Sequence, residues 1–130
     1  MNPYVNNIEE LSVQNETFRT VLFTTKNSQL VLMSLLPGED IGTETHQIDQ
    51  FIRVEQGAGE TILEGKKYAV KDGSAIVVPA GVEHNLINTS KTESLKLYTI
   101  YMPPEHRADT VHLTKAEAET DSNDHYIAGN

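Results

Sequence analysis

The segment from Gly73 to Asn88, GSAIVVPAGVEHNLIN, decides the fold. Its apolar run AIVV has the β-branched composition of a short buried strand. The turn from Pro79 to Gly81 ends this run, because proline has no N–H for a ladder bond and glycine tolerates unusual backbone angles. The imidazole of His84 follows the turn directly. The segment therefore predicts a strand, a tight turn and a candidate metal ligand, in that order.

A second segment, ETHQIDQFIRVEQG from Glu44 to Gly57, carries further ligand types. A carboxylate and an imidazole, Glu44 and His46, stand on alternate residues, and the amide of Gln50 follows. Residues separated by even numbers along a strand share a face, so these three side chains are predicted to point the same way. If the two segments pair inside a barrel, Glu44, His46, Gln50 and His84 converge on one ion.

The same alternation predicts that Phe51, Arg53 and Glu55 point to the opposite face. Arg53 is expected to be solvated, to pair with an acid or to line a subunit contact. Isolated histidines outside both segments are expected at the surface: His106, His112 and His125.

Most of the chain from Thr17 to Tyr101 consists of short runs rich in Val, Ile, Leu, Thr and Tyr, with Pro and Gly turns between them. The predicted strands are residues 29–36, 50–55, 60–65, 66–71, 74–79 and 94–102. Such spacing, without intervening helical patterns, predicts an all-β sandwich or barrel. Short helical segments are expected near residue 8 and over 114–120, where Thr114 and Glu117 are placed like a capping box.

The two segments resemble the motifs of the cupin superfamily. The first cupin motif is Gly, five residues, His-x-His, three or four residues, Glu, six residues and Gly; aligned on Gly38 and Gly57, this chain has Glu44, His46 and Gln50 at the ligand positions. The second motif is Gly, five residues, Pro-x-Gly, two residues, His, three residues and Asn. This chain matches every fixed position of it, at Gly73, Pro79, Gly81, His84 and Asn88.

The resemblance, closest to small single-domain bacterial cupins, implies a jelly-roll β-barrel that holds one divalent metal and forms a homodimer. We expect the chain to consist of an N-terminal arm with first strands (1–28), a cupin barrel (29–113) and a polar C-terminal tail (114–130). The last residues of this tail, DSNDHYIAGN (121–130), are polar and turn-rich and are expected to be mobile unless a partner subunit covers them. The implied metal ligands are Glu44, His46, Gln50 and His84. Glu44 replaces an imidazole and Gln50 replaces a carboxylate, so the ligand set still carries a single negative charge. Nitrogen and oxygen ligands of this kind suit Mn²⁺, Fe²⁺, Zn²⁺ or Ni²⁺.

Two functions are compatible with such a site. One is an enzyme acting on a small polar molecule, by a dioxygenase-like reaction or by an isomerase- or lyase-like step on a sugar or keto acid, with Glu44 as ligand or catalytic base. The other is a non-catalytic barrel that binds a small molecule or a metal. Without a metal, His46 and His84 would hydrogen-bond to each other or to Glu44, and Gln50 would be an amide anchoring neighbouring strands.

Composition excludes several other classes. The 130 residues contain 19 acidic and 10 basic side chains and have a formal net charge of −9, which argues against nucleic-acid binding. There is no cysteine, so thiolate metal sites and disulfides are excluded. No apolar run approaches the roughly 20 residues of a membrane span, and the N-terminus has no leader-like pattern. We therefore expect a cytoplasmic protein with a small-molecule ligand and no membrane partner.

Overall fold

The computed structural model describes residues 2–126, which form two short helices and nine strands. In chain order the elements are α1 (Ile8–Gln14), β1 (Arg19–Thr24), β2 (Gln29–Leu35), β3 (Asp49–Gln56), β4 (Ala58–Leu63), β5 (Lys66–Lys71), β6 (Ala75–Val78), β7 (His84–Asn88), β8 (Leu95–Met102), β9 (Val111–His112) and α2 (Lys115–Thr120). None of the helices in this described part is long and apolar enough to cross a membrane.

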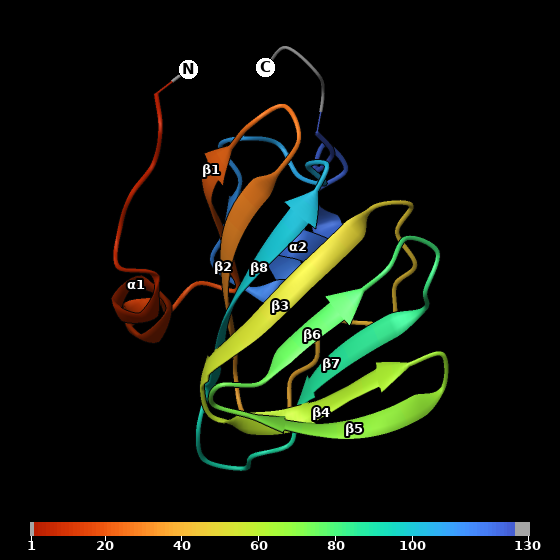
Figure 1. Cartoon of the computed structure of the whole chain (residues 1–130). Helices are drawn as coiled ribbons and strands as arrows, with labels where there is room; N and C mark the ends of the chain where they lie inside the picture. The colour runs from red at the N-terminus through yellow and green to blue at the C-terminus, as the bar shows by residue number, and fades with distance from the viewer. Residues whose placement is uncertain (1, 127–130) are drawn as a thin grey trace.

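The strands form two sheets of antiparallel neighbours (Figure 1). The larger sheet has the order β6-β3-β8-β2-β1-β9, and the smaller one has the order β5-β4-β7. Strands far apart in sequence therefore pair; β2 and β8, for example, run side by side from Gln29 opposite Tyr101 to Leu35 opposite Leu95. The result is the predicted jelly-roll barrel with short flanking helices.

Apolar side chains on the inward faces of both sheets fill the barrel. The most deeply buried of them are Val31, Met33, Leu35, Ile52, Val54, Leu86, Leu95 and Leu97. In β3 the alternation continues from Gln50 through Ile52 to Val54, all of them buried, which confirms the predicted inward face of that strand. An amide thus occupies a position that the strand pattern would otherwise give to an apolar residue.

The helices lie where the sequence indicated. The N-terminal helix α1 begins after Asn7, whose side chain accepts a hydrogen bond from the Glu10 N–H at 3.0 Å. At α2 the Thr114 hydroxyl accepts from the Glu117 N–H at 3.2 Å, as expected of a helix cap. The Glu117 carboxylate reaches back one residue further than in a standard capping box and accepts from the N–H of Leu113 at 2.6 Å.

The outer face of the larger sheet is covered by α1, which packs on β2, β3 and β8. Glu55 points outward with Arg53, as the alternation predicts, and the Arg53 Nη1 lies 3.1 Å from its Oε1. The Glu55 side chain is nevertheless buried, because α1 lies over this region and β3 has an irregular register between Val54 and Gln56. Burial raises the pKa of this carboxyl, and the nearby Arg53 opposes the rise.

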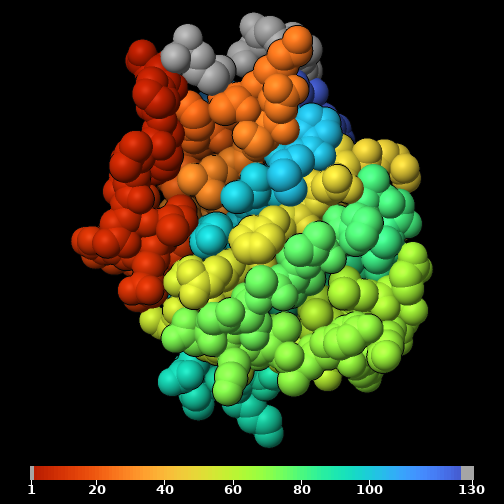
Figure 2. All heavy atoms as spheres, viewed as in Figure 1, coloured from red at the N-terminus to blue at the C-terminus, as the bar shows by residue number. Residues whose placement is uncertain are grey.

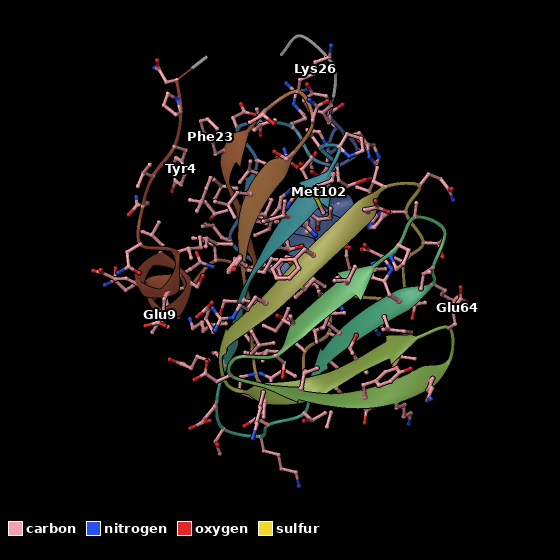
Figure 3. All side chains as sticks on the ribbon, viewed as in Figure 1. Tyr4, Glu9, Phe23, Lys26, Glu64 and Met102 are labelled. Carbon is pink, nitrogen blue, oxygen red and sulfur yellow. The ribbon has the colours of Figure 1, made fainter. Side chains whose placement is uncertain are left out.

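Ahead of α1, the chain runs as an extended arm beside β1 and β2, visible in red in Figure 2. Its Tyr4 ring stacks on Phe23 of β1, with 5.2 Å between the ring centroids (Figure 3). This aromatic contact helps to fasten the arm to the barrel.

The chain after α2 also contacts the barrel. The Tyr126 N–H donates to the Glu105 carbonyl at 3.0 Å, and the carboxylates of Asp121 and Asp124 bond to histidines 112 and 106. Residues 121–126 are thus held by specific contacts within one chain, which differs from the expected mobile tail. The remainder of that predicted tail, residues 127–130, lies outside the described residues.

Candidate metal centre and its cavity

The segment before β3 meets the start of β7 at one end of the barrel. Glu44 and His84 form an isolated antiparallel bridge, in which each backbone N–H donates to the other residue's carbonyl at 2.9 Å. The Gly81 N–H donates to the His46 carbonyl at 2.8 Å, so the turn after β6 also holds this segment. These backbone bonds bring the two predicted segments together.

The bridge places three predicted ligands in one cluster. Glu44, His46 and His84 each offer a ligand atom, and all three atoms lie within 4.8 Å of one another. His84 is buried, and the other two side chains are half-buried. The His84 Nδ1 lies 2.9 Å from the Val82 carbonyl, which can only accept, so Nδ1 carries the proton and Nε2 keeps a free lone pair. The backbone thereby sets the tautomer that a metal ligand needs.

Gln50 enters the barrel from β3 with its amide held in one orientation. Its Nε2 donates to the Thr99 hydroxyl at 3.0 Å, and that hydroxyl donates to the Phe51 carbonyl at 2.9 Å. The side chain is 3% exposed, and its Oε1 is buried without a hydrogen-bond partner. The hydrogen bond that anchors the strands therefore uses only the donor nitrogen of this amide, and the acceptor oxygen has no partner.

Charge in the cluster is coupled between Glu44 and His46. His46 Nε2 lies 2.6 Å from Glu44 Oε2, and His46 Nδ1 lies 3.5 Å from Glu105 Oε1. The hydrogen bond to Glu44 raises the pKa of His46 although burial opposes the rise. Burial opposes ionisation of Glu44, yet its hydrogen bond with His46 leaves the pKa of this carboxyl below its usual value. Without a metal, the pair is a carboxylate beside a readily protonated imidazole.

A cavity of about 180 Å³ opens beside Glu44 and His46. Its other walls come from distant parts of the chain. They include Arg19, Glu105, His106, Lys115, Glu119, Asp124 and His125, with apolar contributions from Phe18, Ile41 and Ala118. Much of this wall lies in α2 and the residues that follow it. The C-terminal region, expected to be a tail, therefore helps to shape the cavity.

Two histidines expected at the surface are buried, and that expectation was wrong. His106 is 6% exposed and His112 is 4% exposed, whereas His125 is exposed. Both are buried because residues 121–126 fold over them, with Asp124 Oδ1 at 2.7 Å from His106 Nδ1 and Asp121 Oδ2 at 2.9 Å from His112 Nε2. Spacing along the sequence carried no signal of these contacts.

Arg19 is the buried cavity residue that sequence reasoning missed. It is 5% exposed, and its Nη1 lies 3.1 Å from His112 Nδ1 and 3.5 Å from Asp124 Oδ2. These partners are separated from Arg19 by 93 and 105 positions in the chain. A basic residue at the start of a strand is too common to have identified it.

Residues 31–101 match the model of the Cupin domain family. The chain is a cupin. This membership confirms the resemblance seen in the two sequence motifs, and the matched region spans β2 to β8, including every member of the Glu44, His46, Gln50 and His84 group.

Similar proteins lie across distant organisms. The Bacillus subtilis relative "Uncharacterized protein YrkC" is 54% identical over 123 residues, which are 89% of this cupin and 66% of YrkC, so the chain spans just under two thirds of that relative. "Uncharacterized protein L612" of Acanthamoeba polyphaga mimivirus is 42% identical over 120 residues, covering 88% of this chain and 74% of L612. The crystal structure of BH2720 from Bacillus halodurans superposes with a TM-score of 0.88 at 45% identity, covering 91% of this chain and 94% of that one.

Proposed function

We propose that this cupin is a metal-dependent enzyme acting on a small polar molecule, with Glu44, His46 and His84 as metal ligands and Gln50 as the fourth. The observation that carries the proposal is the convergence of three ligand atoms within 4.8 Å of one another at the edge of a cavity. A bound divalent ion would act there as a Lewis acid toward a substrate oxygen or would activate dioxygen.

The donor set suits a divalent ion. Two imidazoles, one carboxylate and one amide oxygen are ligands for Mn²⁺, Fe²⁺, Zn²⁺ or Ni²⁺. The unpartnered Oε1 of Gln50 is the kind of buried acceptor that a cation would satisfy. In the metal-free cluster, Glu44 and His46 share a proton across 2.6 Å, and the ion would replace that proton. Metal affinity should therefore fall as the pH decreases.

The protein side chains around the ion would position the substrate. Glu105 lies beside His46 at 3.5 Å and also lines the cavity, so it can orient the imidazole from the side that faces the substrate. Phe18, Ile41 and Ala118 form an apolar portion of the wall, which restricts water. If Glu44 leaves the ion during the reaction, its carboxylate is the nearest base to the bound molecule.

One observation favours the alternative of a non-catalytic binding module. The Glu44–His46 hydrogen bond and the His84–Val82 hydrogen bond give each of the three side chains a partner without any ion. A cavity built in this way binds a small molecule whether or not metal is present. In that case the small molecule should bind in the cavity equally well after a chelator has removed the metal.

Elemental analysis of protein purified without added metal tests the site. We expect about one divalent ion per chain in the wild type, almost none in His84→Ala, and unchanged content in His125→Ala, whose imidazole is exposed at the cavity wall. Equal metal content in wild type and His84→Ala would refute the metal site. Oxygen uptake with Fe²⁺ or Mn²⁺ over a panel of diketones, keto acids and sugar phosphates then separates oxygenation from the other reactions.

The proposal includes the homodimer that the family resemblance implies. Light scattering coupled to size-exclusion chromatography should give twice the 14.4 kDa chain mass. A mass of one chain would remove the homodimer from the proposal and leave the metal site untouched.

A further inference from the structure

Two buried hydrogen-bonding atoms near the proposed metal site have no partner. They are the Nε of Arg19, which is a donor, and the Nε2 of His106. Both side chains are at least nine-tenths buried, and both line the cavity that also contains Glu44 and His46. A buried polar atom without a partner loses its hydrogen bond to water, so its pairing by a bound molecule would be favourable.

Asp124 fixes the chemical character of both atoms. Its Oδ1 lies 2.7 Å from His106 Nδ1, and its Oδ2 lies 3.5 Å from Arg19 Nη1. The carboxylate can only accept, so Nδ1 of His106 carries the proton. Burial lowers the pKa of His106 despite the hydrogen bond to Asp124, which keeps the ring neutral and leaves Nε2 as an acceptor. The charged or titratable groups around the ring are Asp124, Arg19, Glu44 and Tyr101.

His112 fixes the other end of the arginine. Arg19 Nη1 donates to His112 Nδ1 at 3.1 Å, so the proton of this ring lies on Nε2, which donates to Asp121 Oδ2 at 2.9 Å. These bonds use one end of the guanidinium. The Nε–H on its other side remains available as a donor.

The Tyr101 ring lies close to both His106 and the proposed metal ligand His46. Its centroid lies 5.0 Å from that of His106 and 6.2 Å from that of His46, with edge-on geometry in both cases. A molecule of a few heavy atoms in the 180 Å³ cavity can therefore approach both groups at once. This cavity is small compared with sites of about 300–1,000 Å³ that bind drug-sized ligands.

Both permanently charged basic residues of the cavity wall are already paired. The wall contains Arg19 and Lys115 together with four carboxylates. Arg19 pairs with Asp124, and Lys115 pairs with Asp40. An uncharged polar molecule needs neither of these two charges, so it is the ligand that disturbs the existing ion pairs least.

We propose that Arg19 and His106 form a recognition subsite for an uncharged α-hydroxy carbonyl compound. The Arg19 Nε–H donates to the carbonyl oxygen, and the His106 Nε2 accepts from the neighbouring hydroxyl group. His106 is thereby a residue that binds the substrate, holding the hydroxyl group by accepting its hydrogen bond. Asp124 is a positioning residue for both side chains. The subsite names the substrate class of the proposed enzyme. It rests on the proposed function only in assuming that a metal ion binds beside it.

Nitrogen-15 NMR of the histidine side chains in the wild-type protein tests the subsite without any variant. We expect the Nδ1–H tautomer for His106, and a change in its Nε2 signal on titration with hydroxyacetone but not with acetone, which lacks the hydroxyl group. An Nε2–H tautomer would overturn the proposal. Equal responses to the two probes would also overturn it.

A variant series separates this subsite from the metal site. His106→Phe retains an aromatic ring against Tyr101 and should bind hydroxyacetone about tenfold more weakly, which is the effect of losing one good hydrogen bond. Its metal content should equal that of the wild type. Unaltered hydroxyacetone binding in His106→Phe would refute the subsite. Loss of metal from wild type on mild dialysis, with hydroxyacetone binding retained, would instead refute the proposed metal enzyme.

Discussion

The cluster that contains His46 and His84 and the pair His106 and His112 have the same side-chain chemistry but different partners. His46 and His84 lie together with the carboxylate of Glu44. His112 also lies close to two carboxylates, but the guanidinium of Arg19 lies between them at 3.1 Å from its Nδ1. The comparison teaches that ligand types alone do not define a metal site. We therefore expect the group that already contains a cation to stabilise the protein, and we propose the other as the site for an ion.

Removing the carboxylate from the Arg19 group should have the largest effect on stability. Asp124→Ala leaves the charge of Arg19 buried with only a neutral imidazole beside it, and breaking a buried pair in this way costs about 3–5 kcal/mol. Urea denaturation should show this loss in the free energy of unfolding. Metal content per folded chain should not change. A drop in metal content would mean that the two groups are not independent.

Removing a proposed metal ligand should mainly affect metal affinity, whereas Asp124→Ala should mainly affect stability. His84→Ala should weaken metal binding by at least about 100-fold, since even the outer partners of metal ligands contribute 10–100-fold. Competition with a chromophoric chelator measures this affinity. His112→Ala is the matched control, because His112 is equally buried and should lose stability without losing metal affinity. If His112→Ala lost metal and His84→Ala did not, the assignment of the two groups would be reversed.

A variant of Gln50 tests whether the amide oxygen of this residue is a ligand in the proposed metal site. Gln50→Leu removes the unpartnered Oε1 while retaining the volume of the side chain, and we expect about tenfold weaker metal binding. Thr99→Val removes the hydroxyl that orients the amide and is the control for the packing of this site. Equal affinities in Gln50→Leu and wild type would restrict the ligand set to Glu44, His46 and His84.

The smallest effect is expected at Glu55, a buried carboxylate outside both groups. Its pKa is raised by burial, so the folded protein binds its proton more tightly than the unfolded chain does. Stability should therefore decrease as the pH rises from the usual glutamate range through the folded-state pKa. Glu55→Gln should stabilise the protein by about 1 kcal/mol or less at pH 7 and have no such advantage at pH 4. A destabilised variant at pH 7 would show that the Arg53 contact outweighs burial.

The strands and the proposed ligands could be predicted because their signals are local. The apolar runs of β2, β3, β6 and β8 alternate or cluster as strands do, and turns containing glycine or proline bound them. Gln50, His46 and His84 occupy fixed positions in two motifs, each shorter than 21 residues. The bridge between Glu44 and His84 then follows from the barrel, since it joins these two motifs.

The Arg19 group could not be predicted, because its members have no common spacing. Arg19 comes from β1, His106 follows β8, and Asp124 follows α2, so only the folded barrel brings them together. The burial of Glu55 depends likewise on where α1 packs. The local sequence around a polar residue does not distinguish one that a distant segment buries from one that stays at the surface.

The sequence by itself determined that this chain is a cupin barrel with a nitrogen- and oxygen-containing ligand group at one end. Short-range alternation and turn chemistry suffice for this, because they specify which face of each strand enters the core. Only the tertiary structure decided that His106 and His112 are bonded to the carboxylates of Asp124 and Asp121, and that the C-terminal region walls the cavity. The physical reason is that burial and charge pairing depend on contacts across about one hundred positions, and no local pattern encodes them.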